Sequence, residues 1–145
     1  MGCVFCEFVS GKRTRHADGL PFMVIHRTKN TISFLSNVLP KADDGHVLVI
    51  PKKHYESIIK IPSSISKELI EHSSLLIKAL RNYNDGCNML LNDGKYAGQK
   101  VSHLHFHIIP RNKGDDIKIE SYKTKKMSSP QFLVLHNKIK DMLNR

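Results

Sequence analysis

Several short stretches of the chain are rich in hydrophobic residues, and one long segment follows a helical period. The short stretches predict strands at residues 22–26, 31–35, 46–50, 87–91 and 102–109, and the last of them alternates polar and hydrophobic residues. The first two are separated by polar residues and predict an antiparallel pair, and Pro51 is expected to stop the third. Turn-rich sequence at residues 40–45 and aperiodic basic sequence at residues 10–20 predict loops, the second of them mobile.

The helical period begins after Pro62, where Ser63 or Ser64 can cap a helix that runs to about residue 83. Its predicted apolar face is Ile65, Leu69, Leu76, Leu80 and Tyr83. His72, on the same helix, is expected to serve only as a surface or packing residue. A shorter helix is predicted near residues 130–143. Strands, then a long helix, then strands with tight returns predict an α+β fold with an antiparallel sheet.

Three histidines, His103, His105 and His107, alternate with apolar residues in the last predicted strand. A strand sends alternate side chains to opposite faces, so the spacing predicts three imidazoles on one face. Imidazole can act as nucleophile, proton carrier or metal ligand near pH 7. Gly94 and Gly98 lie just upstream, and glycine-containing loops let backbone N–H groups approach phosphate closely. The pattern favours phosphoryl or nucleotidyl chemistry over a purely structural role for the three rings.

Composition and charge narrow the class of protein. With 145 residues, 40% of them hydrophobic and 25% charged, the chain is expected to form one globular domain over residues 1–145. It has no apolar run of membrane-spanning length and no signal-peptide core, so we expect a cytoplasmic protein without a membrane partner. The net charge of +10 attracts anionic partners, whether nucleotides or nucleic acid. The basic C-terminal extension at residues 112–145 leaves nucleic-acid binding open.

The three cysteines do not form a disulfide framework. Cys3 and Cys6 make a C-x-x-C pair, which in a reducing compartment indicates metal ligands or a redox site. Cys87 lies in a predicted strand and is expected to be a buried strand residue.

These motifs together resemble those of the histidine-triad (HIT) nucleotide hydrolases and transferases. The resemblance rests on Gly98-Gln99-x-Val101-x-His103-x-His105-x-His107, on the segment from Gly45 to His54, and on Cys3-Val4-Phe5-Cys6. It is strongest to the zinc-containing, Hint-like branch. The resemblance implies a five-stranded meander sheet and a homodimer whose sheets join edge to edge.

The resemblance also implies roles for individual residues. His105, the middle histidine, would attack the α-phosphate of a nucleotide and carry it as a covalent intermediate. His107 and His46 would donate hydrogen bonds to the phosphate and assist the leaving group, and Gln99 would be a further donor. Asn92 matches a position that touches the ribose or phosphate.

The resemblance further implies a structural zinc site. Its ligands would be Cys3, Cys6, His54 and His103, with residues 1–7 forming a zinc knuckle, because structural zinc takes four nitrogen or sulfur ligands. A catalytic zinc held by His105 and His107 is the rival interpretation. It is disfavoured because the four-ligand set already closes a coordination sphere and no carboxylate lies in this strand to act as base.

The sequence departs from the family pattern in the nucleotide pocket. Ser36 and Asn37 stand where an acidic residue often meets the ribose, and Lys100 stands where a hydroxyl residue often follows the motif glutamine. The loop at residues 37–45 is longer than usual, and no tryptophan lies near the C-terminus. We still expect Ser36, Asn37 and Lys100 to contact the nucleotide, with base, sugar and leaving-group preference open.

The resulting hypothesis is an enzyme that cleaves nucleoside 5′-phosphoramidates or related nucleotidyl conjugates of a purine, with AMP as the expected nucleotide. Two alternatives lie within the same chemistry: cleavage of dinucleoside polyphosphates, and aprataxin-like removal of AMP from nucleic-acid ends. A third alternative is a nucleotide-binding scaffold module without activity.

Overall fold

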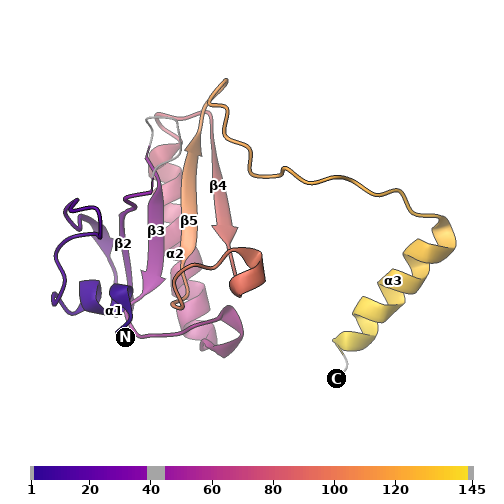
Figure 1. Ribbon diagram of the computed structural model, residues 1–145, viewed down its shortest axis with the longest axis horizontal. Coiled ribbons are helices and arrows are strands. Elements are labelled where there is room, and N and C mark those ends of the chain that lie inside the picture. The colour runs from indigo at the N-terminus through magenta and orange to yellow at the C-terminus, as the bar shows by residue number, and fades with distance from the viewer. Residues whose placement is uncertain (1, 39–44, 144–145) are drawn as a thin grey trace.

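The computed structural model describes residues 2–38 and 45–143, which form one antiparallel sheet with helices (Figure 1). The predicted turn-rich loop at 40–45 lies almost wholly outside these residues. The strands are β1 (Val24–Arg27), β2 (Thr31–Leu35), β3 (Val47–Pro51), β4 (Gly86–Leu91) and β5 (Phe106–Arg111). The helices are α1 (Val4–Val9), α2 (Ser63–Leu80) and α3 (Ser129–Met142). The prediction of an α+β fold with five antiparallel strands is confirmed.

The order of strands across the sheet is β1-β2-β3-β5-β4, so it is not the simple meander that we expected. After β3, helix α2 runs behind the sheet and delivers the chain to its outer edge (Figure 1). β4 forms that edge, and β5 returns into the position between β3 and β4. The histidine-bearing strand therefore lies inside the sheet with a partner on each side.

Two apolar clusters hold the layers together, one on each face of the sheet. Under α2, Leu69 packs against Val49 and Phe106. On the opposite face, Phe5 and Phe8 of α1 pack against apolar side chains of β2 and β3. α1 was not predicted, although the spacing of Phe5 and Phe8 fits one helical face.

Helix α2 ends earlier than predicted. It stops at Leu80, and Tyr83 lies beyond it in a turn with 89% of its surface exposed, so the assignment of Tyr83 to the apolar face is wrong. Ile65, Leu69 and Leu76 are buried as expected. His72 is a packing residue, buried between α2 and β2, where hydrogen bonds join its ring to the hydroxyl groups of Thr31 (2.7 Å) and Ser33 (2.9 Å).

Strand β5 begins at Phe106 rather than at residue 102. The backbone ahead of it bonds outside the ladder, because Leu104 N–H donates to Tyr55 O and His103 N–H donates to Val101 O. The predicted alternation of faces survives this correction. Leu104, Phe106 and Ile108 lie in the cluster under α2, while the rings of His105 and His107 approach each other to 4.8 Å between centroids.

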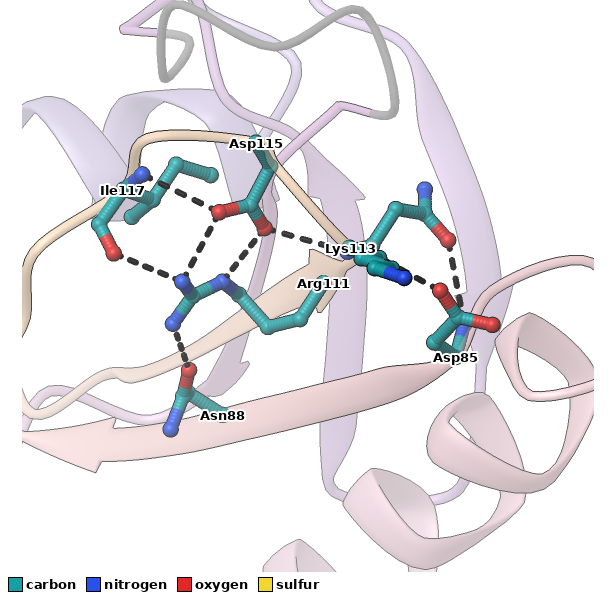
Figure 2. A network of polar contacts seen from close by, with 7 residues as sticks. Asp85, Asn88, Arg111, Lys113, Asp115 and Ile117 are labelled. Atoms are coloured by element: carbon teal, nitrogen blue, oxygen red, sulfur yellow. Dashed lines mark hydrogen bonds and ion pairs between the residues drawn. The ribbon is translucent and has the colours of Figure 1, made fainter.

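A polar cluster closes the far end of β5, where the C-terminal extension leaves the sheet (Figure 2). Arg111 donates two hydrogen bonds to the Asp115 carboxylate, at 2.7 and 2.9 Å, and one to Asn88 of β4 at 2.6 Å. The pairing lowers the pKa of Asp115. Beyond it the chain runs extended to α3, which stands away from the sheet with exposed apolar side chains such as Phe132 (Figure 1).

No helix in the described parts of the chain combines the length and apolar character that crossing a membrane requires.

Candidate active site

Four predicted metal ligands come together where α1 meets the segment ahead of β5. Cys3 is the residue before α1 and Cys6 lies in its first turn, and their sulfur atoms and the candidate ligand atoms of His54 and His103 all lie within 4.8 Å of one another. His103 Nδ1 lies 3.4 Å from Cys3 Sγ and 3.6 Å from Cys6 Sγ, and His54 Nδ1 lies 3.4 Å from Cys6 Sγ.

The tautomer of His103 fits a metal ligand. Its Nε2 lies 2.8 Å from the carbonyl oxygen of Pro51, which can only accept, so Nε2 carries the proton and donates. Nδ1 is therefore left with a lone pair that points toward the two sulfur atoms. In zinc sites, the ring nitrogen of a histidine ligand that does not bind the metal usually donates a hydrogen bond to a nearby acceptor such as a backbone carbonyl.

The distances fit a four-coordinate zinc ion. Zinc bonds sulfur at about 2.3 Å and nitrogen at about 2.0–2.1 Å, so tetrahedral ligands lie roughly 3.5 Å apart. The measured sulfur–nitrogen distances of 3.4–3.6 Å match this ligand-to-ligand distance. Two thiols and two imidazoles are also the donor set that structural zinc prefers. The residues present therefore fit the predicted metal.

His105 follows two residues later and is 5% exposed. Its Nδ1 lies 2.7 Å from the carbonyl oxygen of His103, so Nδ1 donates its proton to that oxygen and Nε2 keeps the lone pair. Burial lowers the pKa of His105, which keeps the ring neutral. One backbone carbonyl thus fixes both the orientation of the ring and the nitrogen that is free to react.

His46 and His107 form a hydrogen-bonded pair across β3 and β5. His46 Nδ1 donates to Val38 O at 2.8 Å, so His46 Nε2 accepts from His107 Nδ1 at 2.9 Å. The second nitrogen of His107, Nε2, is buried and has no hydrogen-bond partner among the described residues. Burial, and then the neighbouring His105 and His46, lower the pKa of His107 to about 4.

A cavity of about 350 Å³ lies in front of these rings. Its apolar wall includes Phe5 and Phe34, and its polar wall includes four of the predicted nucleotide-binding residues, namely Ser36, Asn37, Asn92 and Lys100. His46, His105 and His107 line the same space. Mixed walls of this kind, mostly apolar with a few convergent polar groups, are typical of sites for small ligands.

Gln99 is placed differently. Its Oε1 accepts from Gly94 N–H at 2.7 Å and its Nε2 donates to Glu56 O at 2.8 Å, so both ends of the amide bind backbone. It lines a neighbouring cavity and not the one in front of His105. These two bonds fix the loop from Gly94 to Gly98. Gly98 adopts φ +90° in this loop and lies beside Asn92.

Two polar residues of the cavity wall were not predicted from the sequence. Arg13 and His16 come from the segment at 10–20, which was predicted to be a mobile loop. Neither lies in a periodic pattern or a motif, so no local signal marked them. Their side chains reach the cavity only because the segment folds back over α1.

Comparison with known proteins agrees with this geometry. The HIT domain model matches residues 20–114. An uncharacterised HIT-like protein of Methanocaldococcus jannaschii is 36% identical over 114 residues, covering 78% of this chain and 81% of that protein. An adenosine 5′-monophosphoramidase of Saccharomyces cerevisiae is 34% identical over 109 residues, covering 75% of this chain and 62% of that protein.

Two solved structures are similar over most of the chain. A histidine triad nucleotide-binding protein from Candida albicans superposes with a TM-score of 0.79 at 30% identity, covering 99% of this chain and 98% of that one. A zinc-bound histidine triad family protein from Mycobacterium smegmatis has a TM-score of 0.70 at 31% identity, covering 86% and 85%. The family model, the relatives and the shared fold agree with the resemblance carried by the histidine motif: this chain belongs to the HIT domain family.

Proposed function

We propose that this HIT-family hydrolase cleaves nucleoside 5′-phosphoramidates or related nucleotidyl conjugates, with AMP as the expected nucleotide, through a covalent intermediate on His105. The observation that carries the proposal is the bond from His105 Nδ1 to His103 O, which leaves Nε2 unprotonated and facing the cavity. The similarity to the yeast adenosine 5′-monophosphoramidase supports this choice of substrate.

The first step forms a phosphorus–nitrogen bond between the α-phosphorus and His105 Nε2. The bond from phosphorus to the leaving amine breaks, and the amine takes its electron pair and a proton. His107 Nε2 supplies that proton, because it is buried in the same cavity and an anionic phosphate there favours the protonated ring. Its Nδ1–H bond to His46 holds the ring in place.

The second step returns the enzyme to its starting state. Water attacks the phosphorus, its proton passes to His107 Nε2, and the bond to His105 Nε2 breaks. Imidazole leaves readily because the pKa of its conjugate acid is about 6.5. Two easier displacements replace one difficult one.

Zinc belongs to the proposal as a structural ion held by Cys3, Cys6, His54 and His103, as in the Hint-like branch. Bound there, it would supply only a fixed crosslink between α1 and the segment that carries His105. Homodimer formation and a cytoplasmic location also stay predictions.

The proposal is tested by replacing His105 with Ala. Turnover of an adenylated fluorogenic amine should fall by about 10⁴-fold or more, while AMP binding survives. His136→Ala on α3 is the matched control and should leave turnover unchanged. A His105→Ala variant that keeps most of the activity would contradict the mechanism, as would wild-type turnover of a slow substrate without added nucleotide mass on His105.

A further inference from the structure

The segment at 10–20 is a fixed turn over the cavity. His16 N–H donates to Leu20 O at 2.8 Å, and Phe22 N–H donates to Thr14 O at 2.9 Å. Two side-chain contacts tie the segment to the cavity rim: Arg13 pairs with Glu7 of α1 at 2.8 Å, and Asn37 donates to Asp18 at 3.1 Å. The predicted loop thus has defined hydrogen-bond partners, and these contacts position the side chains that it presents to the cavity.

One of those side chains is His16. Its ring packs edge-on against Phe8, with 5.0 Å between centroids, and lies near Phe22 and Phe34. Its Nε2 is buried and has no hydrogen-bond partner among the described residues, although the side chain lines the cavity. A buried polar atom without a partner costs free energy, so such an atom at a cavity wall marks a place where a ligand can supply the missing bond.

The surroundings of His16 restrict what that ligand group can be. The rings next to His16 are those of Phe8, Phe22 and Phe34, and the charge of Arg13, which lines the same cavity, is paired with Glu7 at 2.8 Å. Burial lowers the pKa of His16, so its ring is neutral and offers one hydrogen bond without a charge. A flat group with apolar faces and a polar edge fits this part of the cavity, whereas a phosphate or sugar does not.

We propose that His16 Nε2 hydrogen-bonds the edge of the substrate's purine base, and that this contact makes His16 a specificity-determining residue of the enzyme. The inference rests on the proposed function, because it assigns one part of the same cavity to the base. It places the base under the turn at 10–20 and leaves the phosphate in front of His105 and His107.

The test compares two ligands that differ only by the base, AMP and ribose 5-phosphate. Dissociation constants are measured by calorimetry for the wild type, for His16→Phe, which keeps the ring shape, and for His16→Asn, which keeps a polar group. His136→Phe on the exposed helix α3 is the matched control. Circular dichroism establishes that each variant is folded.

His16→Phe should weaken AMP binding roughly 3- to 10-fold, the size of one neutral hydrogen bond, and leave ribose 5-phosphate binding within about 2-fold. With the adenylated amine as substrate, KM should rise by a similar factor while kcat changes little, since the base lies away from the reacting bond. His16→Asn should recover part of the loss. If His16→Phe does not fold, His16→Asn is compared with the wild type instead. Its affinity for AMP should then fall by a smaller factor, and its affinity for ribose 5-phosphate should not change.

Two results would overturn the inference: a wild type that binds AMP no better than ribose 5-phosphate, or a His16 variant that weakens both ligands equally or neither. These outcomes are independent of turnover. If the wild type hydrolyses no nucleotide, the proposed function fails, yet the two binding constants still decide whether His16 recognises the base.

Discussion

His105 and His107 are both histidines of one motif, yet their ring nitrogens have different partners. A backbone carbonyl takes the Nδ1 proton of His105, while the His107 Nδ1 proton goes to another imidazole. In the proposed mechanism, the carbonyl leaves His105 Nε2 with the lone pair that attacks, whereas the bond to His46 holds the His107 ring so that its other nitrogen, Nε2, can carry the proton for the leaving group. The two proposed roles, nucleophile and proton donor, thus differ by a single hydrogen bond at each ring.

This division of roles predicts how the leaving group changes the effect of losing His107. His107→Ala should lower kcat about 10²–10³-fold for a phosphoramidate with an alkyl amine, which needs a proton to leave. The loss should be much smaller for the p-nitrophenyl ester of AMP, whose leaving group is stable as an anion. Steady-state kinetics on the two substrates checks this, and an equal loss on both would show that His107 does not supply the proton.

At the scale of elements, the four candidate metal ligands lie between α1 and the chain ahead of β5. α1 has six residues, which is too short to be stable alone, so Phe5, Phe8 and the ligand set must hold it against the sheet. Because the candidate ligand His103 also supplies the carbonyl that binds His105 Nδ1, a metal ion held there would help to position the proposed nucleophile.

We therefore predict about one zinc ion per wild-type chain and little in Cys6→Ser, measured by plasma emission spectrometry. The unfolding temperature of Cys6→Ser should fall by about 5 °C or more, because binding of metal to the folded state contributes to folding. Cys87→Ser removes the third cysteine without touching the cluster and should retain the ion. Equal metal content in both variants would exclude this ligand set.

Hydrogen bonds between the ring of His72 and the hydroxyl groups of Thr31 and Ser33 join α2 to β2. Burial, with a smaller effect of His26, lowers the pKa of His72 to about 4 from its ordinary 6.5. The folded chain thus prefers the neutral ring. The stability that this contributes is complete above pH 6.5 and is lost as the pH falls toward 4.

Between pH 7 and 4.5 the free energy of unfolding should drop by about 2–3 kcal/mol more in the wild type than in His72→Gln, whose amide does not titrate. Urea unfolding at both pH values measures this. A hydrogen bond from Thr28 lowers the pKa of Glu68 to about 2, so Glu68 stays ionised in the folded state over this range, and its contribution is present in both the wild type and His72→Gln. His136→Gln should follow the wild type, and a His72→Gln variant that does so too would refute the assignment.

At the scale of the whole molecule, the strand order decides which surfaces can join two copies. The sheet has β1 at one edge and β4 at the other, and unpaired edge strands are sites where sheets can extend. Each edge carries an apolar side chain of similar exposure, Ile25 on β1 at 47% and Met89 on β4 at 41%. A dimer joined edge to edge must use one of them.

We predict a solution mass of twice the 16.5 kDa of the chain by light scattering. A lysine on the edge strand that forms the dimer should yield a monomer. The lysines of the two copies would face each other across the paired strands, and their like charges repel. Ile25→Lys and Met89→Lys are controls for each other, and one of them should leave the dimer intact. A monomeric wild type, or two variants that both remain dimers, would rule out edge-to-edge joining.

What could be read from the sequence differs between fold and site. Short runs rich in hydrophobic residues identified the five strands, and the helical period identified α2, because both signals are local properties that each segment carries by itself. The end of α2 and the start of β5 were misplaced. Ahead of β5, Leu104 N–H bonds to the distant Tyr55 O, and no pattern within the segment reveals that partner. After Leu80 the backbone tightens into local turns, with Asn82 N–H bonded to Ala79 O and Tyr83 N–H to Leu80 O, so the helix ends although the apolar period continues to Tyr83.

The sequence by itself determined which chemical groups are available to this protein. They are the alternating histidines at 103–107, the cysteine pair at 3 and 6, and the glycines at 94 and 98. The tertiary structure alone decided how those groups are used. Through-space contacts select the protonated nitrogen of each ring, commit Gln99 to backbone partners, and bring His16 over the cavity from a segment without any pattern. The physical reason is that residue type and period are local properties, whereas a hydrogen-bond partner depends on where the rest of the chain has folded.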